Sequence, residues 1–146
     1  MRLLLVSLLL GISTNVFAET VRLKIGIDYS ECEGTGQNQY CRVPEPELQP
    51  VELALDAEGL GEWVTKVKRE DVVITTRVQT CVGRCGAKVQ FLVLQEEQRP
   101  YSNKVRKLME LWTDSLHQLN RVSVDGFEVE FAGGSIAPSI LLGPAD

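Results

Sequence analysis

Residues 72–94 of this 146-residue chain read VVITTRVQTCVGRCGAKVQFLVL, and this stretch predicts a β-hairpin. Its two arms, 72–80 and 87–94, are rich in β-branched and aliphatic residues, and only six residues separate them. Two strands so close together are most simply a hairpin, with CVGRCG as the connection. Side-chain alternation then predicts one buried face, made of Val72, Ile74, Val78, Ala87, Val89, Phe91 and Val93.

Segments on the N-terminal side of this hairpin alternate in the same way. Residues 20–29 have an apolar or aromatic side chain at nearly every second position, and residues 51–55 repeat the pattern. A shorter strand is expected at 63–67. Between the first two segments, three prolines within 44–50 predict a stiff, extended connector or an exposed edge.

Two further strand segments lie near the C-terminus. Residues 122–131 alternate around Asp125-Gly126, a dipeptide that is typical of the type I′ turn of a two-residue hairpin. The last segment, 136–142, contains Pro138, which lacks a backbone N–H, and we therefore expect it at the edge of a sheet.

Between these groups of strands the apolar period changes. Across residues 103–119 the large apolar side chains fall at helical spacing, at Val105, Leu108, Met109, Trp112, Leu116 and Leu119. This spacing predicts one amphipathic helix, about 103–119. The expected fold is mainly β, either an antiparallel sandwich or an α+β sheet, with this one late helix.

The N-terminal residues 1–18 have the pattern of a secretory signal peptide. A single Arg2 precedes a short apolar run, and small residues occupy the positions before a cut near Ala18. We expect residues 19–146 to form a single β-rich globular domain in the periplasm or outside a bacterial cell. No later stretch is long and apolar enough to span a membrane.

The charge balance restricts the class of partner. Fifteen basic and 20 acidic residues give a formal net charge of −5. An acidic protein is a poor electrostatic match for nucleic acid, so we expect none to be bound.

Four cysteines in an exported chain suggest two disulfides. Three pairings are possible, and proximity favours Cys32 with Cys41 and Cys81 with Cys85. A redox motif would place Cys-x-x-Cys at the start of a helix, whereas the second pair has three intervening residues and strand-like flanks. A four-cysteine zinc site would need shorter spacing within the first pair. We therefore interpret both pairs as structural and expect no metal.

Residues for catalysis are scarce. His117 is the only histidine, and no nucleophile elbow, phosphate-binding loop or dinucleotide fingerprint occurs. We assign no catalytic residue and no cofactor. Acidic residues are plentiful, so a carboxylate-based hydrolase stays open as an alternative.

Loops carried by a rigid β scaffold are where recognition usually occurs. Tyr40 lies in the first cysteine loop, Arg84 at the tip of the predicted hairpin, and Tyr101 just after a proline. These three residues are the candidate partner-binding residues, together with the connector at 44–50. The other aromatic residues of strand or helix segments are expected in the core, namely Tyr29, Trp63 and Trp112.

We therefore expect an exported, non-catalytic binding or interaction protein of the bacterial envelope, whose partner is another protein or an envelope component. One alternative is an exported enzyme, either a carboxylate-based hydrolase or a thiol-disulfide protein at Cys81 and Cys85. A further alternative is a structural subunit of a surface assembly.

Overall fold

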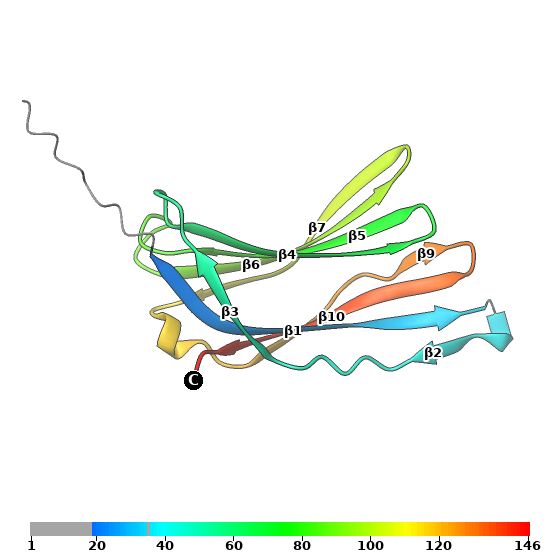
Figure 1. Cartoon of the computed structure of the whole chain (residues 1–146), viewed down its shortest axis with the longest axis horizontal. Helices are drawn as coiled ribbons and strands as arrows, with labels where there is room; N and C mark the ends of the chain where they lie inside the picture. Colours follow the sequence, from blue (N-terminus) through cyan, green and yellow to red (C-terminus); the bar gives the residue numbers. More distant parts are fainter. Residues whose placement is uncertain (1–18, 35) are drawn as a thin grey trace, which may run out of the picture.

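The computed structural model describes residues 19–34 and 36–146, so the expected signal peptide at 1–18 lies outside the described residues. The described chain forms two antiparallel sheets that face each other as a sandwich (Figure 1). The mainly β prediction is confirmed, and the sandwich is the form that the fold takes.

The first sheet, sheet A, is built on the two ends of the described chain. Its central strands are β1 (Thr20–Glu33) and β10 (Gly134–Pro144), paired from Leu23 opposite Pro144 to Glu33 opposite Gly134. Short strands complete both sides. They are β2 (Tyr40–Arg42) and β3 (Gln49–Ala54) along β1, and β8 (Val122–Asp125) and β9 (Val129–Phe131) along β10.

The second sheet, sheet B, is a four-stranded meander. Its strands follow one another in chain order as β4 (Leu60–Arg69), β5 (Val72–Cys81), β6 (Val89–Arg99) and β7 (Ser102–Thr113). Strands β5 and β6 pair with Val78 opposite Val93, so the predicted hairpin is confirmed. Its predicted inner face is buried except for Ala87, which lies in the connection and is exposed.

The core fills the space between the sheets and continues toward one end. The larger cluster joins Leu23 and Ile140 of sheet A to Val78 and Phe91 of sheet B. A second cluster joins Val72 and Ile74 of β5 in sheet B to Val129 of β9 and Ile136 of β10 in sheet A. Full burial of one such side chain contributes about 1.5–3 kcal/mol, so these clusters are the main source of stability.

The expected helix at 103–119 is wrong. Residues 102–113 form β7, and only a 3-10 turn, η2 (Leu116–Gln118), follows. In β7 the pairing with β6 shifts so that Leu108 is an extra residue, and both it and Met109 pack against the core. A β-bulge therefore interrupts the two-residue period. The apparent helical stripe combined these inward residues with Val105 and Trp112, which are exposed on the opposite face of the strand.

The expected hairpin at Asp125-Gly126 is also wrong, because β8 and β9 pair with β10 and not with each other. The backbone N–H of Gly126 donates to the carbonyl of Pro138, at 2.7 Å. Strand β10 is accordingly central, and the expectation of an edge strand fails. Its proline fits there because the side of Pro138 that lacks the N–H faces the break between β8 and β9, where no strand would accept it.

Candidate functional site

The three candidate partner-binding residues lie at opposite ends of the sandwich. Tyr40 follows the loop between β1 and β2, and Tyr101 forms the turn between β6 and β7, at the end shown on the right of Figure 1. We call this the distal end. Arg84 lies at the other end, in the connection between β5 and β6. The structure therefore does not bring Arg84 together with either tyrosine.

A disulfide fixes the segment that carries Tyr40. Cys32 of β1 and Cys41 of β2 lie opposite each other in the sheet and are bonded, as their proximity in the sequence predicts. Between them, residues 36–38 form the 3-10 turn η1. The disulfide holds a strand of only three residues against β1, where backbone pairing alone would be weak.

An ion pair reinforces this attachment. The guanidinium of Arg42 donates to both carboxylate oxygens of Asp28, at 3.0 and 2.8 Å, and also to the carbonyl of Tyr29. The same carboxylate accepts the backbone N–H of Glu45, at 2.7 Å. Chiefly because of the Arg42 hydrogen bonds, the pKa of Asp28 lies well below its ordinary value.

The proline-rich connector lies directly on β1 after this ion pair. A Cβ added at Gly26 would come within 2.6 Å of the carbonyl oxygen of Glu47, so only glycine allows the close approach. Further along, the side chain of Leu48 lies against Gly143 of β10, where a Cβ would come within 3.1 Å of the Leu48 Cδ1. We call residues 40–48 the clamped segment, since the disulfide, the Asp28–Arg42 pair and this contact all hold it on sheet A.

Replacing Asp28 with asparagine should lower the free energy of unfolding at pH 7 by about 1 kcal/mol, a value that allows for the partial exposure of Arg42. Because the folded-state pKa is the lower one, the stabilisation is complete above the unfolded-state pKa and decreases as the pH falls toward the folded-state value. The difference between wild type and variant should therefore narrow below about pH 4. Urea unfolding at several pH values measures it.

The matched control is Asp71→Asn, at an exposed position in the turn between β4 and β5. This variant should unfold like the wild type across the same pH range. A pH dependence as large as that of Asp28→Asn would contradict the assignment to the ion pair.

The clamped segment exposes two large apolar side chains. Tyr40 is 73% exposed and Val43 is 76% exposed, although the backbone that carries them is held at several points. Tyr101 is fully exposed as well, but its turn lies at the tip of the hairpin of β6 and β7, which extends away from sheet A (Figure 1). Of the residues predicted from sequence, Tyr40 therefore has the most strongly anchored surroundings.

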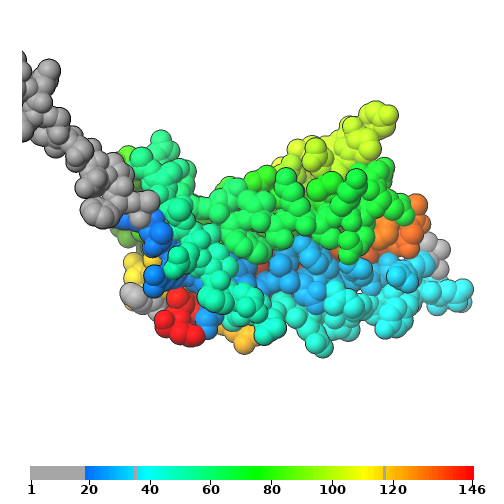
Figure 2. All heavy atoms as spheres, viewed as in Figure 1, coloured from blue at the N-terminus to red at the C-terminus, as the bar shows by residue number. Residues whose placement is uncertain are grey.

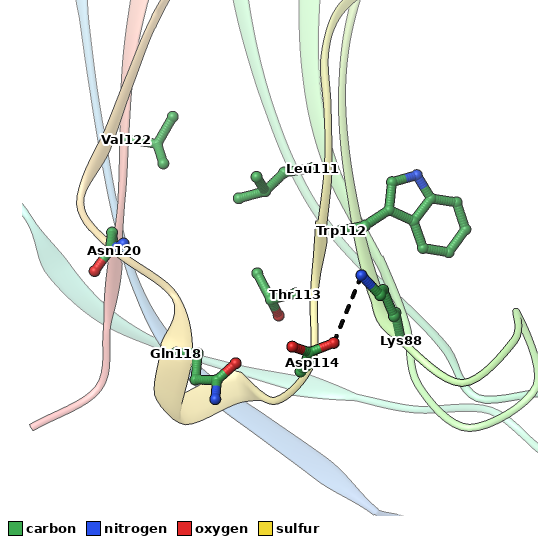
Figure 3. A pocket seen from close by; sticks show the side chains of 8 residues that line it. All are labelled: Lys88, Leu111, Trp112, Thr113, Asp114, Gln118, Asn120 and Val122. Atoms are coloured by element: carbon green, nitrogen blue, oxygen red, sulfur yellow. Dashed lines mark ion pairs between the residues drawn. The ribbon is translucent and has the colours of Figure 1, made fainter.

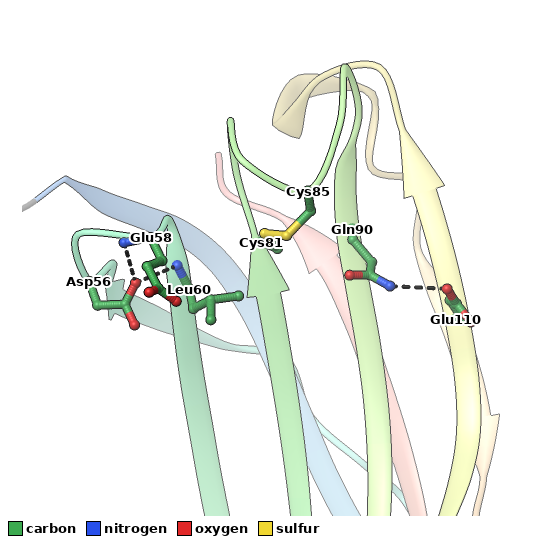
Figure 4. The surroundings of a disulfide bond; sticks show 7 residues. All are labelled: Asp56, Glu58, Leu60, Cys81, Cys85, Gln90 and Glu110. Atoms are coloured by element: carbon green, nitrogen blue, oxygen red, sulfur yellow. Dashed lines mark hydrogen bonds between the residues drawn. A yellow bond between two sulfur atoms is a disulfide. The ribbon is translucent and has the colours of Figure 1, made fainter.

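The connection between β5 and β6 contains the second disulfide, Cys81–Cys85 (Figure 4). Cys81 is buried, and the N–H of Val82 donates to the carbonyl of Gly59 in the preceding loop. Arg84 projects from this tip as an exposed side chain. The disulfide thus closes a turn that is docked on its neighbour, as the structural interpretation of the sequence predicts.

A shallow cavity of about 310 Å³ lies between β7 and β8 (Figure 3). Leu111 and Thr113 point across it toward Val122, whereas the ring of Trp112 points away. At its rim Lys88 and Asp114 form an ion pair of 3.6 Å. Asp114 is the single carboxylate among the lining residues, so the cavity lacks the two carboxylates of a glycoside hydrolase.

Sequence reasoning missed the outer face of sheet B. Trp112, expected in the core, is 42% exposed there, and its indole N–H donates to Glu110. The prediction failed because Trp112 was placed on a helix. Trp63 and Tyr29 do pack against the core, each only partly buried. The strand register places further partly or largely exposed apolar side chains on the same outer face, at Leu60, Val64, Leu92, Leu94 and Val105.

Among the described residues, no group of three or more histidine, cysteine or acidic side chains is arranged to hold a metal ion. Within residues 19–34 and 36–146 no helix is long and apolar enough to cross a membrane. The side chain of His117 lies outside the described part of the structure.

Comparison with models of protein families, with curated proteins and with solved structures found no match to this chain.

Proposed function

We propose that this chain is an exported, non-catalytic binding protein that recognises another protein of the bacterial envelope through its clamped segment. One observation carries the proposal: Tyr40 and Val43 are exposed on a backbone held by a disulfide, an ion pair and a close glycine contact. Both disulfides also fit a protein that functions outside the cytoplasm.

Rigidity is what makes exposed apolar side chains useful for binding. Ordering a mobile loop on association costs free energy, and a segment that is already ordered avoids that cost. Tyrosine adds a large, stiff surface with a polar hydroxyl, which is why it is enriched in interfaces. Pro44 and Pro46 keep the adjoining backbone extended, in the form that aromatic-lined grooves of partner proteins recognise.

The negative charge of the clamped segment indicates which charge its partner should carry. Glu45 and Glu47 are exposed beside Tyr40 and Val43. A complementary partner would present an apolar groove with basic residues at its rim. An anionic envelope component would be repelled by the same carboxylates, and for this reason we favour a protein partner.

The enzyme alternative has weaker support. Both cysteines proposed for thiol chemistry are joined in a disulfide whose first member is buried. The cavity at β7 and β8 has one carboxylate, but a second cavity of about 330 Å³ is lined by Glu128 and Glu130, so the hydrolase alternative depends on the test of turnover. Turnover in a screen of hydrolase substrates, or rapid exchange of Cys81–Cys85 with glutathione, would contradict the non-catalytic proposal.

Site-specific photo-crosslinking in cells that naturally produce the protein tests the proposal. A photo-reactive phenylalanine analogue at position 40 or 43 should give one discrete crosslinked protein, whose identity mass spectrometry establishes. The same analogue at position 101 is the matched control, because Tyr101 is even more exposed at the same end but lies outside the clamped segment. Crosslinking at 101 but not at 40 or 43 would contradict the proposal.

With the captured partner purified, Tyr40→Ala should weaken binding by roughly thirtyfold, the effect typical of an aromatic residue that dominates an interface. Thermal unfolding of the variant should stay unchanged, because the ring is mostly in water. Binding that is insensitive to Tyr40→Ala and to Val43→Ala would refute the assignment of this surface.

A further inference from the structure

In the described part of the chain, the long strand edges belong to sheet B. On sheet A, both sides are made of strands of three to six residues, and Pro44, Pro46 and Pro50 interrupt one of them. Short strands and prolines are common ways to prevent an edge from pairing with another chain. On sheet B the edges are β4 and β7, of ten and twelve residues.

The two edges of sheet B differ in regularity. Both strands carry three basic residues close together, but only β7 contains a bulge, at Leu108. Strand β4 pairs with β5 without any shift, from Leu60 opposite Cys81 to Arg69 opposite Val72. Its free edge faces the viewer in Figures 1 and 2, above the strands and the connector of sheet A. At the ends of this edge Leu60 already exchanges hydrogen bonds with Asp56, and the carbonyl of Lys68 accepts from Arg69. The regular central part, Glu62 to Lys66, has no such partner among the described residues and is a template for a further strand.

We propose that the strand added to this edge is β4 of a second copy of the same chain. The two strands run antiparallel about a two-fold axis that passes through Thr65, and the two B sheets become one continuous sheet of eight strands. An interface with two-fold symmetry must be complementary to itself, so the sequence of β4 can be tested for this property.

Pairing about Thr65 places favourable side chains opposite each other along the strand. On the outer face, Glu62 of each copy lies opposite Lys68 of the other. On the inner face, Trp63 lies opposite Val67, and Thr65 lies opposite its own copy. Opposite charges, an aromatic with a β-branched residue, and two threonines are the cross-strand pairs that stabilise antiparallel sheets.

The other registers that keep each side chain on its own face are poorer. Pairing about Lys66 would place that lysine against its own copy and Glu62 against Glu70, which is repulsive. Pairing about Val64 gives an overlap of the same length within β4 and also one type of ion pair, Glu62 with Lys66. It places Trp63 opposite the polar Thr65 and Val67 opposite Gly61, so the apolar pair on the inner face is lost. Of these three registers, the one centred on Thr65 therefore has the best side-chain pairs, and in it Glu62 of one copy pairs with Lys68 of the other.

The charges along the edge are already placed for this pairing. Arg77 and Gln79 of the neighbouring strand β5 donate to the carboxylate of Glu62, at 2.8 and 2.7 Å, and so hold it on the outer face. Arg69 is turned toward sheet A and pairs with Glu31 of β1, so it adds no charge next to Lys68. A strand of another protein without a matching acid would meet uncompensated lysines, which makes the edge selective for its own copy.

Sedimentation equilibrium and light scattering on the mature protein test the proposal. The wild type should dimerise reversibly, and Lys68→Glu should raise the dissociation constant by about tenfold or more, because two attractive pairs become repulsive. The double variant Glu62→Lys with Lys68→Glu should recover most of the loss, since the charges are exchanged and the pairing is kept. Lys66→Glu is the matched control and should change the dissociation constant by less than threefold.

Crosslinking provides a second measurement that does not depend on charge. Thr65→Cys should give a covalent dimer under mild oxidation, because its two copies would be directly opposite. Val67→Cys, on the same face, should give none, since its copies would be separated by several residues along the strands. A protein that stays monomeric at all accessible concentrations, a larger effect from Lys66→Glu than from Lys68→Glu, or crosslinking through position 67 alone would each overturn the proposal.

Discussion

Replacing Gly59 with alanine should lower the free energy of unfolding by about 3 kcal/mol or more. Gly59 has a positive φ of 78°, where a side chain costs about 1–2 kcal/mol. In addition, a Cβ at this position would overlap the carbonyl oxygen of Val82 in the connection between β5 and β6. Relief of that overlap separates the two loops and breaks the hydrogen bond from the Val82 N–H to the Gly59 carbonyl.

The control for this prediction is Gly83→Ala. Gly83 also has a positive φ, of 85°, but a Cβ there would meet nothing within 4 Å. It should cost only the backbone term of about 1–2 kcal/mol. Chemical denaturation of both variants with the disulfides intact compares them directly. Equal losses for the two variants would show that the contact between the loops contributes nothing to stability.

The second large effect concerns Gln95, a buried amide between the sheets. Its Nε2 donates to the carbonyl of Phe127, at 2.8 Å, and its Oε1 accepts the N–H of the same residue, at 2.7 Å. The Gln95 amide thus forms the two backbone hydrogen bonds with Phe127 that a neighbouring strand would otherwise form in the loop between β8 and β9. Gln95→Leu removes both bonds and leaves two backbone groups without partners, so we expect a loss of about 3 kcal/mol.

Gln98 of the same strand provides the control, because it is exposed and Gln98→Leu should change stability by less than about 0.5 kcal/mol. Hydrogen exchange adds a local readout: the Phe127 amide should lose protection in Gln95→Leu ahead of the amides of β5. The guanidinium of Arg106, 4.4 Å from the centre of the Phe127 ring, should keep the loop near its position. Protection of that amide unchanged from the wild type would contradict the prediction.

Local sequence patterns predicted the parts of the fold that depend on neighbouring residues. The hairpin at 72–94 was predictable because its two arms alternate without interruption and a short connection forces them to pair. The cysteine pairing was favoured for a related reason, since each pair closes a short loop. The same applies to the extended form of 44–50, where proline restricts the backbone directly.

Predictions failed where one extra residue changed the local pattern and where long-range pairing decided the structure. One extra residue in β7 interrupts the two-residue spacing of the apolar side chains, so that their spacing resembles that of a helix. Apolar spacing alone does not distinguish such a bulge from a helix. Asp125-Gly126 has the composition of a tight hairpin, but the longer β10 pairs with both flanking strands and thereby separates them. Here long-range pairing overrides a local turn preference.

The candidate site was predictable only in part. Tyr40 could be selected as an aromatic residue within a cysteine loop, but nothing in the sequence links Asp28 to Arg42, fourteen residues apart in the chain. That ion pair forms because β1 and β2 lie side by side. The same holds for Gly26, whose role becomes visible only when the connector is seen to lie on it.

By itself, the sequence determined that the chain is mainly β, where the hairpin at 72–94 lies, and that the chain has a single histidine and none of the catalytic motifs considered above. These properties follow from side-chain type and spacing, which act over a few residues. The tertiary structure decided which strands are central, which edges stay unpaired and which polar groups meet across the sheets. Such relations depend on residues far apart in the chain, and only the simultaneous packing of both sheets brings them within contact distance.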